Sequence, residues 1–163
     1  MRDDNDIERA MASHGDTVWR VCLMRTESRA DAQDAFQETF FTYATHDSVA
    51  FQDEEHRRAW LIRVATNRCI DMARARLDVE SYDESTAEID SRHHTRPEDQ
   101  PEAALWEVSE ALDQLAPVQR QALYLTVCEG YPAVEAAKMM GVPVNTVYSW
   151  VARGKEHLRE ALS

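Results

Sequence analysis

The stretch AAKMMGVPVNTVYSWVARGK, residues 136–155, decides how the C-terminal part of this chain folds. Gly141 can adopt a positive φ, and Pro143 ends one helix and is favoured at the start of the next. Three valines recur at helical spacing and supply an inward-facing stripe: Val144, Val147 and Val151. The sequence therefore predicts two short helices joined by a tight turn, the second packed through this stripe.

The second of these helices keeps polar and small side chains on its other side. They are Asn145, Tyr148, Ser149, Ala152 and Arg153. Amide, hydroxyl and guanidinium groups on one helical face match the hydrogen-bonding edges of bases in the DNA major groove. The segment is therefore interpreted as a helix-turn-helix element that binds DNA.

The net charge of −12 argues against a free-standing DNA-binding protein. More than half of it lies in residues 78–102, which hold nine acidic and two basic residues. A protein that binds DNA alone usually carries a basic footprint. This chain is expected to bind naked DNA weakly and to gain affinity from a larger partner.

Composition favours an all-α fold, because the 163 residues include four glycines and five prolines and lack alternating strand patterns. Helical periodicity is lost in residues 78–102 and resumes at residue 103. We predict two small helical domains, 1–77 and 103–163, joined by a flexible acidic linker, 78–102. No apolar run approaches the roughly 18 residues of a membrane span, and the acidic N-terminus is unlike a secretory signal. A cytoplasmic protein without membrane insertion is expected.

The cysteines indicate thiols rather than disulfides. Cys22, Cys69 and Cys128 are odd in number, far apart and placed in apolar helical patterns. They are predicted to be buried and free.

Three helices are predicted in the N-terminal domain, at about 6–26, 29–46 and 57–77. The second carries an acidic face with Asp31, Asp34 and Glu38. That face could be solvated, could dock on a basic protein surface, or could hold a metal or perform acid–base chemistry. The last alternative is the weakest, because no His or Cys joins these carboxylates at ligand spacing.

The third helix is rich in arginine, with six arginines opposed only by Asp71 within residues 57–77. Arg63, Asn67 and Arg74 share one face, and Trp60 lies nearby. Such a face suits a phosphate backbone and an unstacked base; the alternative is a solvated cationic face with Trp60 in the core. No phosphate-binding glycine loop or nucleophile–base motif is present, so no enzyme, cofactor or metal is expected.

Four segments together resemble one family. DAQDAFQETF at 31–40 is similar to the region 2 signature of bacterial RNA polymerase sigma factors of the extracytoplasmic-function (ECF) group, and WLIRVATNRCID at 60–71 resembles the next element of that region. ALDQLAPVQR at 111–120 and residues 141–155 resemble region 4. Their order and spacing match across nearly the whole chain.

The resemblance implies an alternative sigma factor that binds core RNA polymerase and directs initiation at promoters with −35 and −10 elements. The residues implied to bind the polymerase clamp are Asp31, Asp34, Gln37 and Glu38. Those implied to bind the single-stranded −10 element are Arg57, Arg58, Trp60, Arg63, Asn67 and Arg74. Those implied to bind the −35 element are Asn145, Thr146, Tyr148, Ser149, Ala152, Arg153 and Lys155.

The same resemblance implies the partners. They are the β′ clamp and β flap of core RNA polymerase, promoter DNA and, as in many family members, an anti-sigma factor. This chain departs from the family at Tyr148 and Trp150, where many members have a basic residue. Phosphate anchoring is therefore expected to depend on Arg153, Lys155 and Arg159.

Two other interpretations stay open at this point. A stand-alone helix-turn-helix regulator would bind duplex DNA as a dimer without polymerase. A protein that mimics a sigma factor and sequesters a partner would suit the negative charge. The arginine-rich helix and the acidic segment favour the sigma factor over both.

Overall fold

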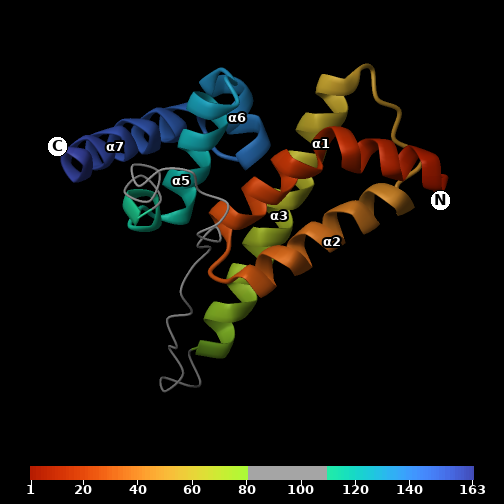
Figure 1. Cartoon of the computed structure of the whole chain (residues 1–163), viewed down its shortest axis with the longest axis horizontal. Coiled ribbons are helices and arrows are strands. Elements are labelled where there is room, and N and C mark those ends of the chain that lie inside the picture. The colour runs from red at the N-terminus through yellow and green to blue at the C-terminus, as the bar shows by residue number, and fades with distance from the viewer. Residues whose placement is uncertain (81–109) are drawn as a thin grey trace. The chain divides into compact units, whose positions relative to one another are not determined.

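The computed structural model describes the backbone of residues 1–80 and 110–163 and the side chains of residues 1–77 and 110–163 (Figure 1). These residues belong to two separate units, each of which is considered by itself. Both are built from helices, and the described residues include no strand, which confirms the predicted all-α class. The predicted linker, 78–102, lies outside the described residues except for its first three, which continue a helix to Glu80.

Unit 1 consists of α1 (Asp4–Arg25), α2 (Arg29–Thr45) and α3 (Glu54–Glu80), and each helix packs against the other two (Figure 1). Short polar side chains begin all three, because each accepts a backbone N–H of the first turn. The three bonds are Asp6 N to Asp3 Oδ1 at 2.8 Å, Asp31 N to Ser28 Oγ at 3.1 Å, and His56 N to Asp53 Oδ1 at 2.7 Å. The bond to Asp53 explains why α3 begins three residues before the predicted start.

The core of unit 1 comes from the predicted apolar faces. Its fully or nearly fully buried side chains include Val18, Val21, Cys22, Ala35, Phe40, Tyr43, Leu61, Ile62, Ala65 and Cys69. Cys22 and Cys69 are free and buried, as predicted. A hydrogen bond between the two thiols, together with burial, raises the pKa of Cys22 above its ordinary value.

Unit 2 contains a helical stretch at 110–113, then α5 (Pro117–Leu123), the π-helical segment η2 (Tyr124–Cys128), α6 (Ala133–Met140) and α7 (Val144–Leu162). The turn between α6 and α7 matches its prediction. Gly141 has φ 68°, in the left-handed region, and Pro143 stands at the cap position of α7. Val147 is fully buried.

One cysteine prediction is wrong, because Cys128 is exposed. Val127 beside it, also placed in the apolar pattern, is 58% exposed. Both lie in η2, where the backbone N–H of Glu129 donates to the carbonyl of Tyr124 at 3.0 Å. A π turn contains more residues than an α turn, so the residues at its end leave the inward face.

Gly154 of α7 packs directly on α5. A Cβ at this position would lie 2.5 Å from Leu123 Cδ1 and 3.0 Å from its Cγ, and Leu123 is buried. Alanine in place of glycine gains about 1 kcal/mol of helix propensity, whereas overpacking a core costs about 1–3 kcal/mol.

We therefore expect Gly154→Ala to lower the stability of unit 2 by about 1 kcal/mol, or a melting temperature several degrees lower in circular dichroism. Ser149→Ala is the matched control, because Ser149 is exposed on the same helix and should be neutral or slightly stabilising. A higher melting temperature for Gly154→Ala would contradict the tight packing on Leu123.

None of the helices among the described residues is long and apolar enough to span a bilayer.

Candidate nucleic-acid interface

The outer face of α7 carries the side chains that the sequence placed there. Asn145, Tyr148, Ser149, Ala152, Arg153 and Lys155 are exposed, and Thr146 is half-buried. The structure records no side-chain hydrogen bond or ion pair between Asn145, Tyr148 or Ser149 and another described residue, so their donors and acceptors are available to a ligand. Trp150 is half-buried, because it lies toward the inward side of the helix.

A second face lies on α3. Arg63, Asn67 and Arg74 are exposed, and their spacing of four and seven residues puts them on one side of the helix. Within the part of the chain that the structure describes, none of the three is hydrogen-bonded or ion-paired through its side chain. Two guanidinium groups and an amide are therefore available along one line of the helix, an arrangement that suits a phosphate backbone.

The rest of α3 is less cationic than the sequence predicted. Arg57 forms an ion pair with Glu54, Arg58 lies 3.9 Å from Glu55, and Arg76 forms an ion pair with Asp31 of α2. The prediction of one opposing carboxylate counted only residues 57–77. The carboxylates that pair with these arginines lie outside that range: Glu54 and Glu55 in the first turn of α3, and Asp31 in α2.

Trp60 belongs to an aromatic cluster around the α2–α3 loop, residues 46–53. Its ring centroid lies 5.6 Å from that of Phe51 and 6.1 Å from that of Tyr43. Phe51 also stacks on Tyr43 with an interplanar angle of 21°, and the Arg57 guanidinium lies 5.1 Å from the Phe51 centroid. Trp60 is half-buried, so it packs in this cluster and still presents part of its surface. Phe51 was not among the predicted site residues, because it is a single aromatic residue in an otherwise polar segment.

The outward face of α2 carries Asp34, Gln37 and Glu38, all exposed and without a side-chain partner among the described residues. Asp31 differs from them, because it is half-buried and paired with Arg76. Phe41 lies one turn after Gln37 and Glu38 and is 64% exposed. Phe41 was not among the predicted site residues; it lies outside the buried face of α2, which includes Ala35, Thr39 and Tyr43.

Tyr43 ties this part of the unit to α1. Its hydroxyl donates to Asp6 Oδ1 at 2.6 Å. This hydrogen bond is the largest cause that holds the pKa of Asp6 below its usual value of 3.8, and Arg2 lowers it further. Because the folded-state pKa is depressed, the ionised carboxylate stabilises the fold above the unfolded pKa, and that contribution is lost as the pH falls through the folded pKa.

We expect Tyr43→Phe to lower the free energy of unfolding at about pH 7 by about 1.5–3 kcal/mol, the usual size for a hydrogen bond to a charged group. The difference between wild type and variant should shrink as the pH falls through the depressed pKa of Asp6. Urea unfolding at about pH 7 and at a strongly acidic pH, at which the carboxylate is protonated, measures it. A difference that is equal at the two values, or larger at the lower one, would show that the ionised carboxylate is not the partner that matters.

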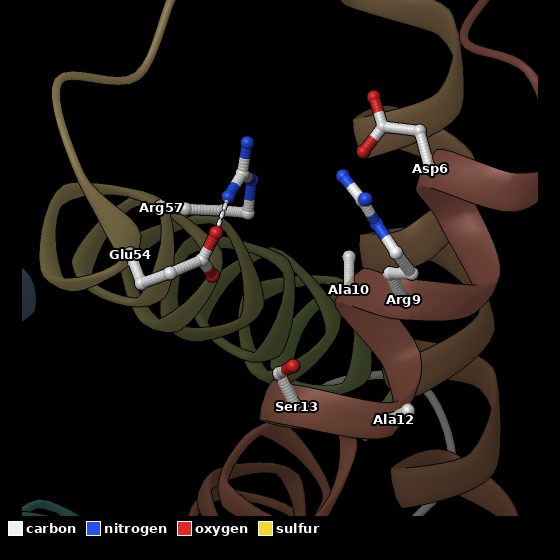
Figure 2. A pocket seen from close by; sticks show the side chains of 7 residues that line it. All are labelled: Asp6, Arg9, Ala10, Ala12, Ser13, Glu54 and Arg57. Carbon is white, nitrogen blue, oxygen red and sulfur yellow. Dashed lines mark hydrogen bonds and ion pairs between the residues drawn. The ribbon is translucent and has the colours of Figure 1, made fainter.

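A hollow of about 340 Å³ lies between α1 and the start of α3, and Figure 2 shows the side chains that line it. Asp6 and Arg9 of α1 and Glu54 and Arg57 of α3 line it, so its charges cancel. His14 Nε2 lies 2.8 Å from Glu54 Oε2, and this contact is the largest cause that lowers the pKa of Glu54. The described residues contain no group of three side chains that could hold a metal ion. The hollow therefore offers neither net charge for a phosphate nor a metal site.

An acidic helix and a cationic helix in one unit, followed along the chain by a helix-turn-helix unit, have the order in which the sequence predicted region 2 and region 4. Family comparison agrees in both order and extent: residues 10–77 match "Sigma-70 region 2" and residues 105–158 match "Sigma-70, region 4". The chain is 32% identical over 141 residues to the ECF RNA polymerase sigma factor SigL of Mycobacterium tuberculosis, covering 83% of this chain and 77% of SigL. This chain belongs to the ECF RNA polymerase sigma factor family.

A second relative and a solved structure are similar to this chain as well. The ECF RNA polymerase sigma factor SigE of Mycolicibacterium smegmatis is 32% identical over 156 residues, which cover 92% of this chain but 59% of SigE. The chain thus spans 59% of the length of that relative. Among solved structures, the sigma factor RpoE in complex with the anti-sigma factor NepR from Bartonella quintana has the same fold, with a TM-score of 0.78, 23% identity and 96% of each chain covered.

Proposed function

We propose that this chain is an alternative sigma factor, which binds core RNA polymerase and selects promoters through their −35 and −10 elements. The proposal rests on two exposed faces whose side chains suit nucleic acid, one on α3 and one on α7. The side chains of Arg63, Asn67, Arg74, Asn145, Tyr148 and Ser149 have no partner among the described residues, and the chain matches region 2 and region 4 in order. A stand-alone regulator would need only the α7 face.

The α2 face is proposed to dock on the polymerase clamp. Asp34, Gln37 and Glu38 are exposed, and the aromatic ring of Phe41 extends their surface. An exposed aromatic residue beside polar groups is typical of an energetically important part of a protein interface. The set that the resemblance implies also contains Asp31. Its ion pair with Arg76 joins the start of α2 to α3.

The α3 face is proposed to bind the single-stranded −10 element. Arg63 and Arg74 supply charge for phosphates, and Asn67 between them supplies an amide for a base edge. Trp60 and Arg57 lie beside the α2–α3 loop, where an unstacked base could pack. Arg58 completes the predicted set, although Glu55 partly offsets its charge.

The α7 face is proposed to contact the −35 element as duplex. Asn145 and Ser149 can exchange hydrogen bonds with base edges, and the exposed ring of Tyr148 can contact a thymine methyl or donate through its hydroxyl. Thr146 and Ala152 complete the base-facing surface. Arg153 and Lys155, with Arg159 beyond them, supply the phosphate contacts.

Polymerase is proposed to supply most of the affinity. A net charge of −12 opposes binding to naked DNA, whereas two weak DNA contacts become strong when a shared partner holds them close to the same promoter. An anti-sigma factor remains a predicted regulator; the RpoE structure above contains one, and no such protein is part of this structure.

In vitro transcription tests the proposal. The purified chain is mixed with bacterial core RNA polymerase and a promoter library from the source genome. Transcripts that depend on the chain and share two upstream elements are the expected result. Binding to core without transcripts would favour a sequestering protein, and duplex binding without any affinity for core would favour a regulator; either outcome would overturn the proposal.

A further inference from the structure

Arg2 fastens the N-terminus of the chain to the α2–α3 loop, residues 46–53. Its backbone N–H donates to the carbonyl of Ala44 at 2.8 Å and its Nε to the carbonyl of Tyr43 at 2.9 Å. Its Nη2 donates to the carbonyls of His46 at 3.1 Å and Val49 at 2.9 Å. One residue thus bridges the last turn of α2 and the middle of the loop.

The physical reason lies in the end of α2. The last carbonyls of a helix have no partner within the helix, and the helix dipole favours a cation there. The last turn of α2 contains no basic residue. Arg2 supplies the missing cation from a distant part of the chain, and Asp6, 3.3 Å away, holds its other guanidinium nitrogen.

Arg2 also supports the aromatic cluster. Its guanidinium carbon lies 4.4 Å from the ring centroid of Tyr43 and 5.2 Å from that of Phe51. Phe51 contacts Trp60 on another side and lies under the Arg57 guanidinium. The Arg2 side chain therefore contacts Phe51, and Phe51 in turn contacts Trp60 and Arg57 of the proposed −10 site.

A direct contact between Arg2 and DNA does not suit the geometry. The Arg2 side chain is 9% exposed, and its guanidinium nitrogens already donate to carbonyls and to Asp6. A cation in this position can set the shape of the loop but has little surface left for a phosphate.

We propose that Arg2 is a positioning residue for promoter recognition, which fixes the α2–α3 loop so that Phe51, Trp60 and Arg57 are prearranged for the single-stranded −10 element. The proposal rests on the proposed function of the α3 face. A loop that is already ordered spends less binding free energy on ordering when DNA binds. Loss of the Arg2 bonds should therefore weaken −10 binding and leave polymerase binding unchanged.

The test compares wild type with Arg2→Ala, Arg2→Lys and Arg9→Ala in the full chain. Lysine keeps the charge but cannot reach several carbonyls at once. Arg9 is a matched control, since it is an exposed arginine of α1 without a hydrogen bond or ion pair to another described residue. Circular dichroism checks that each variant is folded.

Two readouts are needed. Hydrogen exchange of the free chain reports the order of residues 46–53, because exchange follows local opening. Fluorescence anisotropy with assembled holoenzyme reports affinity for a labelled single-stranded oligonucleotide, the non-template −10 strand of a promoter identified by the transcription experiment. Affinity for core polymerase is measured in parallel.

For Arg2→Ala we expect faster exchange in the loop and about tenfold weaker oligonucleotide binding, which corresponds to about 1.4 kcal/mol. Core affinity should stay within about twofold. The exchange rate and the oligonucleotide affinity of Arg2→Lys should lie between those of wild type and Arg2→Ala. Arg9→Ala should match wild type in both measurements. Unchanged exchange, or faster exchange with unchanged DNA binding, would overturn the role of Arg2. If the wild-type chain binds neither core nor the oligonucleotide, the proposed function itself fails, and the role of Arg2 with it.

Discussion

Asp34→Arg is expected to abolish initiation by lowering the affinity for core RNA polymerase roughly 100-fold, as for an interface hot spot of about 3 kcal/mol. Asp34 is exposed on the α2 face, and the described residues supply its side chain with no partner. The charge reversal therefore breaks no side-chain bond among the described residues of unit 1. It places a cation on the α2 face, whose carboxylates are proposed to contact the polymerase clamp. Competition with a labelled sigma factor for core polymerase measures the effect.

Asp16→Arg is the matched control for this charge change. Asp16 is an exposed carboxylate of α1 that likewise has no side-chain partner among the described residues. Both variants should retain the wild-type melting temperature. If Asp34→Arg bound core as tightly as Asp16→Arg, the α2 face would not be the docking surface, and Phe41 would have no proposed partner.

The double variant Asn145→Ala with Tyr148→Ala is expected to reduce −35-dependent initiation roughly 100-fold, because each direct contact to a base contributes about 1–3 kcal/mol. Both side chains are exposed and have no partner among the described residues of unit 2, so the stability of this unit should be unchanged. Run-off transcription on a matched pair of templates, one with an intact and one with a scrambled −35 element, measures the effect.

The template pair supplies an internal control. On the scrambled template, wild type and the double variant should be equally active, because Asn145 and Tyr148 no longer have their −35 bases to contact. Glu160→Ala, in the last turn of α7, should behave as wild type on both templates. A double variant that is equally impaired on both templates would indicate a role in polymerase binding rather than in −35 recognition.

Local sequence rules predicted what depends on local geometry. The valine stripe fixed the inward side of α7, and therefore the outward side with Asn145 and Tyr148. The predicted helix starts, at about 6, 29 and 57, lie within three residues of those observed at Asp4, Arg29 and Glu54. The exposure of Arg63, Asn67 and Arg74 followed from their spacing alone.

Contacts between distant parts of the chain could not be predicted in this way. Asp31 and Arg76 are 45 residues apart, and no periodicity connects them. Arg2 lies in the acidic N-terminal segment, and no sequence pattern indicates that it bonds to a loop more than 40 residues away and supports the aromatic cluster. Cys128 is exposed because η2 changes the helical repeat, a change that the apolar pattern did not reveal.

Promoter binding with and without core polymerase tests the central claim most directly. An electrophoretic mobility shift assay uses duplex containing the −35 and −10 elements identified by transcription, at a fixed moderate salt concentration. The account predicts no stable complex with the chain alone and a specific complex once core polymerase is added, because the chain carries a net charge of −12 and its two proposed DNA-binding faces lie in different units. Tight, specific binding of the duplex by the chain alone would contradict it.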